Sequence, residues 1–368
     1  MTGVRWLSAI GAGLFLVAAG SCAGDDPCAG ATRCQAAGEL PLPRLSDYDF
    51  FQGEMRELRP KDGVIPYTVI SPLWADQAGK GRFIVLPPGE KATFAERDGW
   101  SYPEGTIIIK TFYFDHDRRD PSAGARIVET RLLIQKGGVW EPITYLWNEA
   151  ETEAELIKVG TRVNVDYVDV DGSEKTEEYI VPNLDRCDSC HARDDATQIL
   201  GIITPQLNME IEVDGAKVNQ LEWLAEQGVF DGALPAVDSL ERFVDPLDAA
   251  AASLEDRARS YLHANCSHCH RDGGGASKSG LVLERWESDS LKLGICKVPA
   301  AAGPGTGGRS HDILPGSPEG SIMVFRMNST DPEIKMPELP NRVINTAGVE
   351  LISAWIAAMP PHECGALP

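Results

Sequence analysis

Two short segments of this 368-residue chain share the pattern C-x-x-C-H, and they constrain its fold and chemistry more than any other feature. They are Cys187-Asp-Ser-Cys190-His191 and Cys266-Ser-His-Cys269-His270. The pattern is the signature of c-type haem attachment. On a helix, positions i and i+3 share a face, so two thiols can bind one haem while the next histidine reaches its iron. The sequence therefore predicts two covalently bound haem c groups, anchored by Cys187, Cys190, Cys266 and Cys269 and ligated by His191 and His270.

Other uses of paired cysteines fit this chain less well. The first cysteines of the two segments stand at positions 187 and 266, which is 79 positions apart. Zinc sites that combine two C-x-x-C pairs usually separate them by about 15–20 residues. A thioredoxin-type redox pair needs no following histidine, and no βαβ pattern surrounds either segment.

A methionine near the end of the chain is the candidate sixth ligand of the second iron. Met336, in Ile-Lys-Met-Pro-Glu, follows His270 by 66 residues and precedes a C-terminal helical pattern. Small c-type cytochromes have this order of haem helix, loops, methionine and closing helix, and a thioether opposite an imidazole raises the iron potential. Met327 and His311 are the alternatives, and a packed loop methionine is the structural alternative for Met336.

The sixth ligand of the first iron stays open. Met209 follows His191 by 18 residues, which repeats the order of the second segment at a shorter spacing. His116, His263 or an iron with an open position are the alternatives. His268 lies between the cysteines of its own motif, and we expect it at the surface.

The first residues are typical of an exported protein. Residues 1–21 carry one positive charge, Arg5, ahead of an apolar run over 10–19, which is the composition of a signal peptide. Ala-Gly-Ser-Cys22 is similar to a bacterial lipobox, so Cys22 is the predicted lipidation site, with ordinary signal cleavage as the alternative. We therefore expect a periplasmic protein that is anchored by lipid in the outer membrane, with residues 22–45 as a tether.

Export also bears on the remaining cysteines, because thiols tend to pair outside the cytoplasm. Cys296 and Cys364 bracket the loops and the terminal helix of the last region, and a disulfide between them is expected, with free buried thiols as the alternative. Cys28 and Cys34 are a second candidate pair, within the tether.

The hydrophobic pattern divides the rest of the chain into three regions. Residues 46–183 contain strand patterns at 106–114, 126–135, 139–147 and 163–167, and Asp171-Gly172 offers a hairpin turn into a further strand at 177–181. Residues 184–250 and 251–368 each carry one C-x-x-C-H segment, with helical patterns at 218–229, 254–270 and 347–359. The expected fold is multidomain β plus α: an N-terminal antiparallel β-sandwich or barrel-like domain, then two α-helical cytochrome c-like haem domains, the first of them minimal.

Charge restricts the partners. The chain has 34 Lys and Arg against 55 Asp and Glu, a formal net charge of −21. Such an acidic protein is a poor ligand for nucleic acid. It suits weak, salt-sensitive encounters with basic periplasmic electron donors and acceptors.

Several stretches resemble an uncharacterised bacterial family of exported di-haem c-type cytochromes with an N-terminal non-haem domain. The resemblance covers nearly all of the mature chain and runs through the stretches RLSDYDFF, EGTIIIKTFYF, YIVPNLDRCDSCH, NQLEWLAEQGVF, YLHANCSHCHRDGG, LGICKVP and KMPELP. It implies periplasmic electron transfer, with Met336 and Cys296 fitting the pattern of the family, and it supplies no substrate.

Three functions follow from these observations. The first is a lipid-anchored di-haem electron carrier. The second is a di-haem redox enzyme, such as a peroxidase or an oxidase, with an open iron at the first haem. In that case Trp147, Asn148 and Glu149 are candidates for its distal wall, with strand-end packing as the structural alternative. The third is a β domain that recognises a partner protein or a glycan, with the haems as a redox sensor.

Overall fold

The structure is a computed structural model that describes residues 40–183, 190–194, 196–300, 302–338, 342–361 and 364. The predicted signal peptide, the lipidation site Cys22, the pair Cys28 and Cys34, and the first haem anchor Cys187 lie outside the described residues. Among the described helices, none combines the length and the apolar character that crossing a bilayer requires.

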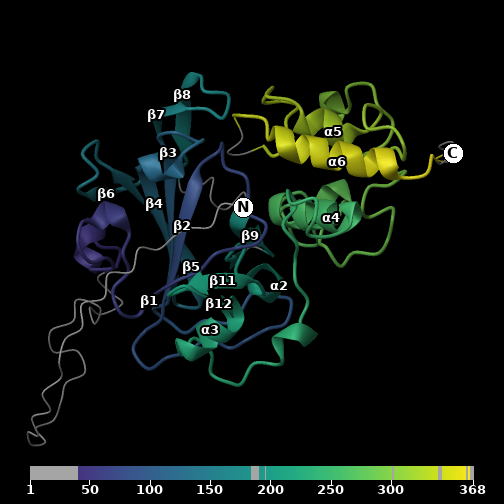
Figure 1. Ribbon diagram of the computed structural model, residues 1–368. Helices are drawn as coiled ribbons and strands as arrows, with labels where there is room; N and C mark the ends of the chain where they lie inside the picture. The colour runs from purple at the N-terminus through teal and green to yellow at the C-terminus, as the bar shows by residue number, and fades with distance from the viewer. Residues whose placement is uncertain are drawn as a thin grey trace, which may run out of the picture.

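A six-stranded antiparallel sheet forms the larger half of the molecule (Figure 1). Its strands follow chain order, so each one pairs with its neighbours in sequence. They are β1 (Val64–Pro66), β2 (Gly79–Val85), β3 (Ile107–Asp115), β4 (Ala125–Lys136), β5 (Val139–Trp147) and β6 (Ala154–Ile157). A short 3-10 turn, η4 (Pro121–Ala123), lies between β3 and β4. Two separate strands, β7 (Thr161–Val168) and β8 (Glu174–Val181), make a hairpin at one end, with Asp171-Gly172 at its turn as expected.

The two faces of the sheet carry different residues because successive side chains of a strand point to opposite sides. One face is largely apolar and includes Phe83, Ile109, Leu132 and Ile143. Two 3-10 turns near the start of the described chain, η2 (Leu45–Tyr48) and η3 (Met55–Glu57), contribute Leu45, Tyr48 and Met55 to the core on that side. The other face carries two apolar clusters, one around Ile108 and one around Phe112.

The region after the sheet consists of short ribbons and short helices. Its elements are β9 (Ala192–Arg193), β10 (Ala196–Thr197), α2 (Thr204–Leu207), β11 (Glu210–Val213), β12 (Ala216–Asn219), α3 (Gln220–Glu226) and η5 (Val237–Ser239). The expected helix over 218–229 shortens to α3, because residues 216–219 pair with β11 across the turn at Asp214-Gly215. An Asp-Gly pair between alternating segments is a strong hairpin signal.

The C-terminal region contains three helices and long loops. The helices are α4 (Leu254–Asn265), α5 (Ile322–Met327) and α6 (Thr346–Ala358), and the loops include η6 (Ser277–Ser279) and η7 (Gly303–Thr306). Helix α4 packs on α6, where Gly348 lies against the Tyr261 ring and a side chain at that position would collide with it. Cys296 and Cys364 form a disulfide, the pairing that the sequence predicted.

The loop between β1 and β2 joins the sheet to both later regions. In this loop Ser71 exchanges two hydrogen bonds with the amide of Gln206, at 3.0 and 2.8 Å. The backbone of Trp74 donates to Asn265 Oδ1 at the end of α4, at 2.7 Å. Buried Asp76 accepts the backbone N–H groups of Arg342 and Val343 at 2.7 and 3.0 Å. The loop therefore fixes the three regions to one another.

The expected fold class is wrong in two respects. The N-terminal region is one open sheet with a separate hairpin, whereas a closed barrel or a sandwich of two sheets was expected. The described part of the chain is mostly β, with short helices, and it does not contain two α-helical cytochrome domains. The expected helix after residue 218 is shorter for a local reason. The turn pair Asp214-Gly215 places residues 216–219 in a two-stranded ribbon, so only the short helix α3 remains.

Candidate functional site

The second C-x-x-C-H segment follows α4 directly. The Ser253 hydroxyl caps this helix by accepting the backbone N–H of Asp256 at 3.1 Å. The helix ends at Asn265, so the expectation of a helix through residue 270 is wrong. The segment folds into tight turns, in which the N–H groups of Cys269 and His270 donate to the Cys266 carbonyl at 3.2 and 2.9 Å. Gly274 lies directly against the Cys269 carbonyl, where a Cβ has no room.

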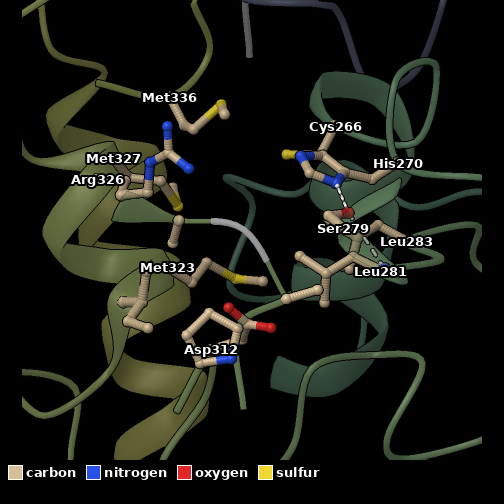
Figure 2. Close-up of a pocket in the computed structure, with 14 residues that line it drawn as sticks. Cys266, His270, Ser279, Leu281, Leu283, Asp312, Met323, Arg326, Met327 and Met336 are labelled. Carbon is tan, nitrogen blue, oxygen red and sulfur yellow. Dashed lines mark hydrogen bonds between the residues drawn. The ribbon is translucent and has the colours of Figure 1, made fainter. Parts of the chain in front are cut away.

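A pocket opens beside this segment, between α4 and α5 (Figure 2). Its cavity volume is about 90 Å³, and the space between its walls is about 650 Å³ when the part open to solvent is included. Its lining is mostly apolar, and its sulfur, nitrogen and oxygen groups come from a small number of side chains. The lining residues are Cys266, His270, Ser279, Leu281, Leu283, Pro299, Ala300, Ala302, Asp312, Ile322, Met323, Arg326, Met327 and Met336.

His270 is held in one orientation on the wall of the pocket. Its Nδ1 and the Ser279 hydroxyl are 3.0 Å apart, and its carbonyl accepts the Leu283 N–H at 2.9 Å. Burial lowers the pKa of His270 to about 4, so its imidazole is neutral at neutral pH. A neutral ring fixed through Nδ1 leaves Nε2 free as a metal ligand.

Met336 lies on the opposite wall, across the pocket from His270 (Figure 2). Its backbone N–H donates to the Arg326 carbonyl at 3.0 Å. The Arg326 side chain in turn donates through Nε to the Ile334 carbonyl at 2.7 Å. Helix α5 thus holds the loop that carries Met336. Sequence reasoning missed both Ser279 and Arg326, because nothing in the local pattern signals a contact with a residue 8 to 10 positions away.

The described end of the first C-x-x-C-H segment, Cys190 and His191, lies next to the second segment. The Asp194 N–H donates to the Gly273 carbonyl at 3.1 Å, which pairs the residues just after each motif. The His191 Nδ1 is 2.7 Å from the Gln198 carbonyl. Burial, together with the positive charge of Lys110, lowers the pKa of His191 to about 3.

Three side chains from the two motifs form a cluster. The ligand atoms of Cys190, His268 and Cys269 all lie within 4.8 Å of one another. The hydrogen bond from Cys269, and a further one from His268, lower the pKa of the Cys190 thiol to about 4. The same contact raises the pKa of Cys269. The cluster thus holds a thiolate beside a thiol and an imidazole, which are donor types that suit zinc and copper.

This cluster overturns the prediction of two covalently bound haem c groups. Cys190, which was to anchor the first haem, contacts Cys269, which was to anchor the second. The described residues that follow the first motif form short ribbons and short helices, and no helical domain. The two motifs therefore meet in one shared cluster and do not form two separate haem sites. His268, expected at the surface, is 8% exposed and belongs to the cluster, so that expectation is wrong as well.

The other candidate ligands lie in different surroundings. Met327 lines the pocket beside Met336, whereas Met209 lies between α2 and β11 and is not part of its lining. His263 packs between the rings of Phe243 and Trp286, with centroids 4.7 and 4.8 Å away, and its Nδ1 accepts the Arg285 N–H. His116 is an exposed residue after β3, and His311 pairs with the Ser310 hydroxyl.

The strand end at 147–149 has a structural role. Trp147 is buried in the core, and its ring N–H donates to the Thr130 hydroxyl at 3.0 Å. Asn148 closes a turn by accepting the Thr152 N–H at 3.0 Å. Glu149, the third of these candidates, is an exposed residue of that turn.

Comparison with models of protein families, with curated proteins and with solved structures finds no match to this chain.

Proposed function

We propose that this protein transfers single electrons through one haem that is attached at the Cys266–His270 motif. The observation that supports this most strongly is the pocket that Cys266, His270 and Met336 line together. It brings a thiol, an imidazole nitrogen and a thioether sulfur to one space with apolar walls. When bound there, a haem would supply a reversible one-electron couple.

The pocket residues fit such a group in chemistry. A haem is larger than the cavity of about 90 Å³, so the loops over the pocket would have to open to admit it. Leu281, Leu283 and Ile322 supply apolar contact, and Cys266 is a free thiol. His270 and Met336 are the side chains that would hold the haem iron, and an imidazole with a thioether would raise the iron potential.

Neighbouring side chains hold His270 and Met336 in place. Ser279 fixes the His270 ring through Nδ1, which keeps Nε2 free. The reciprocal bonds of Arg326 with the 334–336 loop fix the Met336 backbone. Such supports limit rearrangement when the charge of a bound iron changes. Attachment through both cysteines requires the Cys269 thiol to turn away from Cys190.

The setting of this proposal comes from the sequence. An exported chain with a lipid on Cys22 would work at the periplasmic face of the outer membrane. The net charge of −21 favours basic donor and acceptor proteins, with encounter rates that fall as salt rises. A di-haem enzyme would need a second haem at the first motif, where Cys190 instead lies against Cys269.

The test begins with the cofactor content of the purified chain from cells that attach haem c. We expect about one haem per chain by the alkaline pyridine spectrum, and a porphyrin mass on the peptide with residues 266–270. Met336→Ala should abolish the long-wavelength band of a thioether-ligated ferric iron and lower the potential. Met209→Ala is the matched control and should change neither. A chain without haem, or with haem only on the peptide of the first motif, would refute the proposal.

The Cys190–His268–Cys269 cluster supports a second candidate, a site for a soft or borderline metal ion such as zinc. Both candidates need Cys269, so they exclude each other if the haem uses both thiols. Metal analysis separates them. Tightly bound zinc that is lost in Cys190→Ser, in a chain without porphyrin, would favour this second site.

A further inference from the structure

Three positively charged residues form a row across the large sheet. Arg82 on β2 lies directly opposite Lys110 on β3, and Lys110 lies directly opposite Arg131 on β4. Directly opposed residues of antiparallel strands point to the same face, with Cβ atoms about 4.5–5.5 Å apart. Thr144 on β5 is opposite Arg131 and continues the row.

Only one member of this row has a carboxylate partner among the described residues. Arg131 pairs with Glu129, a fully buried carboxylate that also accepts the Tyr179 hydroxyl at 2.6 Å. The Arg82 side chain donates to the Lys80 carbonyl at 3.2 Å. Within the described part of the chain, the Lys110 side chain makes no hydrogen bond and no ion pair, and only charge interactions at longer range reach it. Like charges directly opposite each other are destabilising, so the row is costly to the fold as it stands.

The row is half-buried between apolar clusters of the sheet. On the same face of the sheet, Ile84, Ile108 and Leu133 form part of one apolar cluster on one side of it. Phe112 and Leu146 belong to another cluster on the other side. Burial, with the charges of Arg82 and Arg131, lowers the pKa of Lys110 to about 7.

A hydroxyl in the row is also without a partner. Thr144 is 2% exposed, and its Oγ1 makes no hydrogen bond. Buried polar atoms are almost always hydrogen-bonded, so an unsatisfied hydroxyl in the same row as Arg82 and Lys110 indicates that a polar group is missing here.

Cys190 does not fill this role. A thiolate there would supply one negative charge, and its sulfur is already partnered by Cys269 and His268. Arg82 and Lys110 together present two cations without a carboxylate among the described residues.

We propose that Arg82, Lys110 and Arg131, with the Thr144 hydroxyl, form a binding site for an oxyanion. An arginine fork matches the oxygens of a carboxylate or a phosphate, and a lysine adds a point charge. The site belongs to the sheet and goes beyond electron transfer, and it needs no iron. A small organic acid and inorganic phosphate share this chemistry, and the experiment distinguishes them.

The test is a calorimetric titration of the purified full chain with sodium succinate and with inorganic phosphate, in chloride buffer at constant ionic strength. We expect at least one of them to bind with a dissociation constant of about 1 mM or tighter. Lys110→Gln and Arg82→Gln should each weaken that binding about tenfold or more, because a charge-assisted hydrogen bond is lost. Lys175→Gln is the matched control, since Lys175 is an exposed strand residue of β8. It should leave the affinity unchanged.

A thermal unfolding series separates loss of binding from loss of fold. Without ligand, Lys110→Gln should unfold at the same temperature as the wild type or higher, because a contact between like charges is removed. With ligand, only the wild type and Lys175→Gln should gain stability. Tighter binding of succinate would identify an organic acid as the ligand class, and tighter binding of phosphate an inorganic oxyanion. Absence of binding in the wild type, or equal binding in Lys110→Gln, would overturn the proposal.

Discussion

The two C-x-x-C-H segments have the same pattern and very different surroundings. The second faces an apolar pocket, with Met336 across from His270. The first faces a row of cations on the sheet, and electrostatic effects of Lys110 and Arg131 reach both Cys190 and His191. In both segments the histidine is fixed through Nδ1, by Gln198 in the first and Ser279 in the second. A five-residue motif thus supplies the donor atoms, while residues far away in the chain decide what those donors can bind.

The largest expected effect separates the two histidines. His270→Ala should reduce haem content at least about tenfold, because the candidate axial ligand on the pocket wall is removed. His191→Ala should leave the haem content unchanged. The alkaline pyridine spectrum of equal amounts of each variant measures this. An equal loss of haem in both variants would show that both histidines are needed for haem binding and would contradict this prediction.

Removing the disulfide should weaken the region around the second segment. Cys296→Ser, or Cys364→Ser, should lower the free energy of unfolding by about 2–4 kcal/mol, because the denatured chain loses a constraint over 68 positions. Thermal or urea unfolding under non-reducing conditions measures the change. Addition of a reductant to the wild type should reproduce it, and no further loss should occur in the variants. A wild type that is indifferent to the reductant would show that the bond does not stabilise this region.

Helices α4 and α6 cross beside the second segment, and their packing leaves no room for a larger side chain at Gly348. Gly348→Val should cost about 1–3 kcal/mol, because its side chain would collide with Tyr261 and force the helices apart. Gly232→Val, at a position where a Cβ meets open space, is the control and should change stability by less than about 0.5 kcal/mol. Equal unfolding temperatures for the two variants would contradict the close crossing.

The smallest expected effect is a pH dependence from His263, which lies at the end of α4 close to the second segment. Burial lowers its pKa to about 3, whereas the unfolded value is about 6.5. The unfolded chain therefore binds more protons between these values, so this stabilisation is complete above pH 6.5 and is lost as pH falls towards 3.

His263→Gln should thus show a shallower loss of stability than the wild type between pH 6.5 and pH 4 in urea unfolding. Identical slopes for the wild type and His263→Gln would show that His263 titrates normally in the folded chain.

Sequence patterns predicted the local elements where short-range rules dominate. The strands β3, β4, β5, β7 and β8 fall where alternation and β-branched residues predict them, and α6 falls where an apolar stripe does. The prediction was wrong for residues 218–229, although Asp214-Gly215 carried the hairpin signal. The helix through residue 270 also failed, because the Asn265 side chain holds the Trp74 backbone and Gly274 needs room for the turn.

The candidate site was predicted only in part. Cys266, His270 and Met336 were identified from spacing, and they line one pocket. Ser279 and Arg326 were not, because their contacts depend on how loops fold over α4 and α5. The contact of Cys190 with Cys269 joins residues of separate segments and has no signal in either motif.

The sequence by itself determined the types of donor atom, the acidic charge, and the strands of the sheet, because these depend on composition and on periods of two to four residues. Only the tertiary structure decided that the two motifs share one cluster, that Met336 faces His270, and that Arg82, Lys110 and Arg131 align in one row. The physical reason is that strand register and the packing of loops bring together residues far apart in the chain. No local pattern encodes the energies of those contacts.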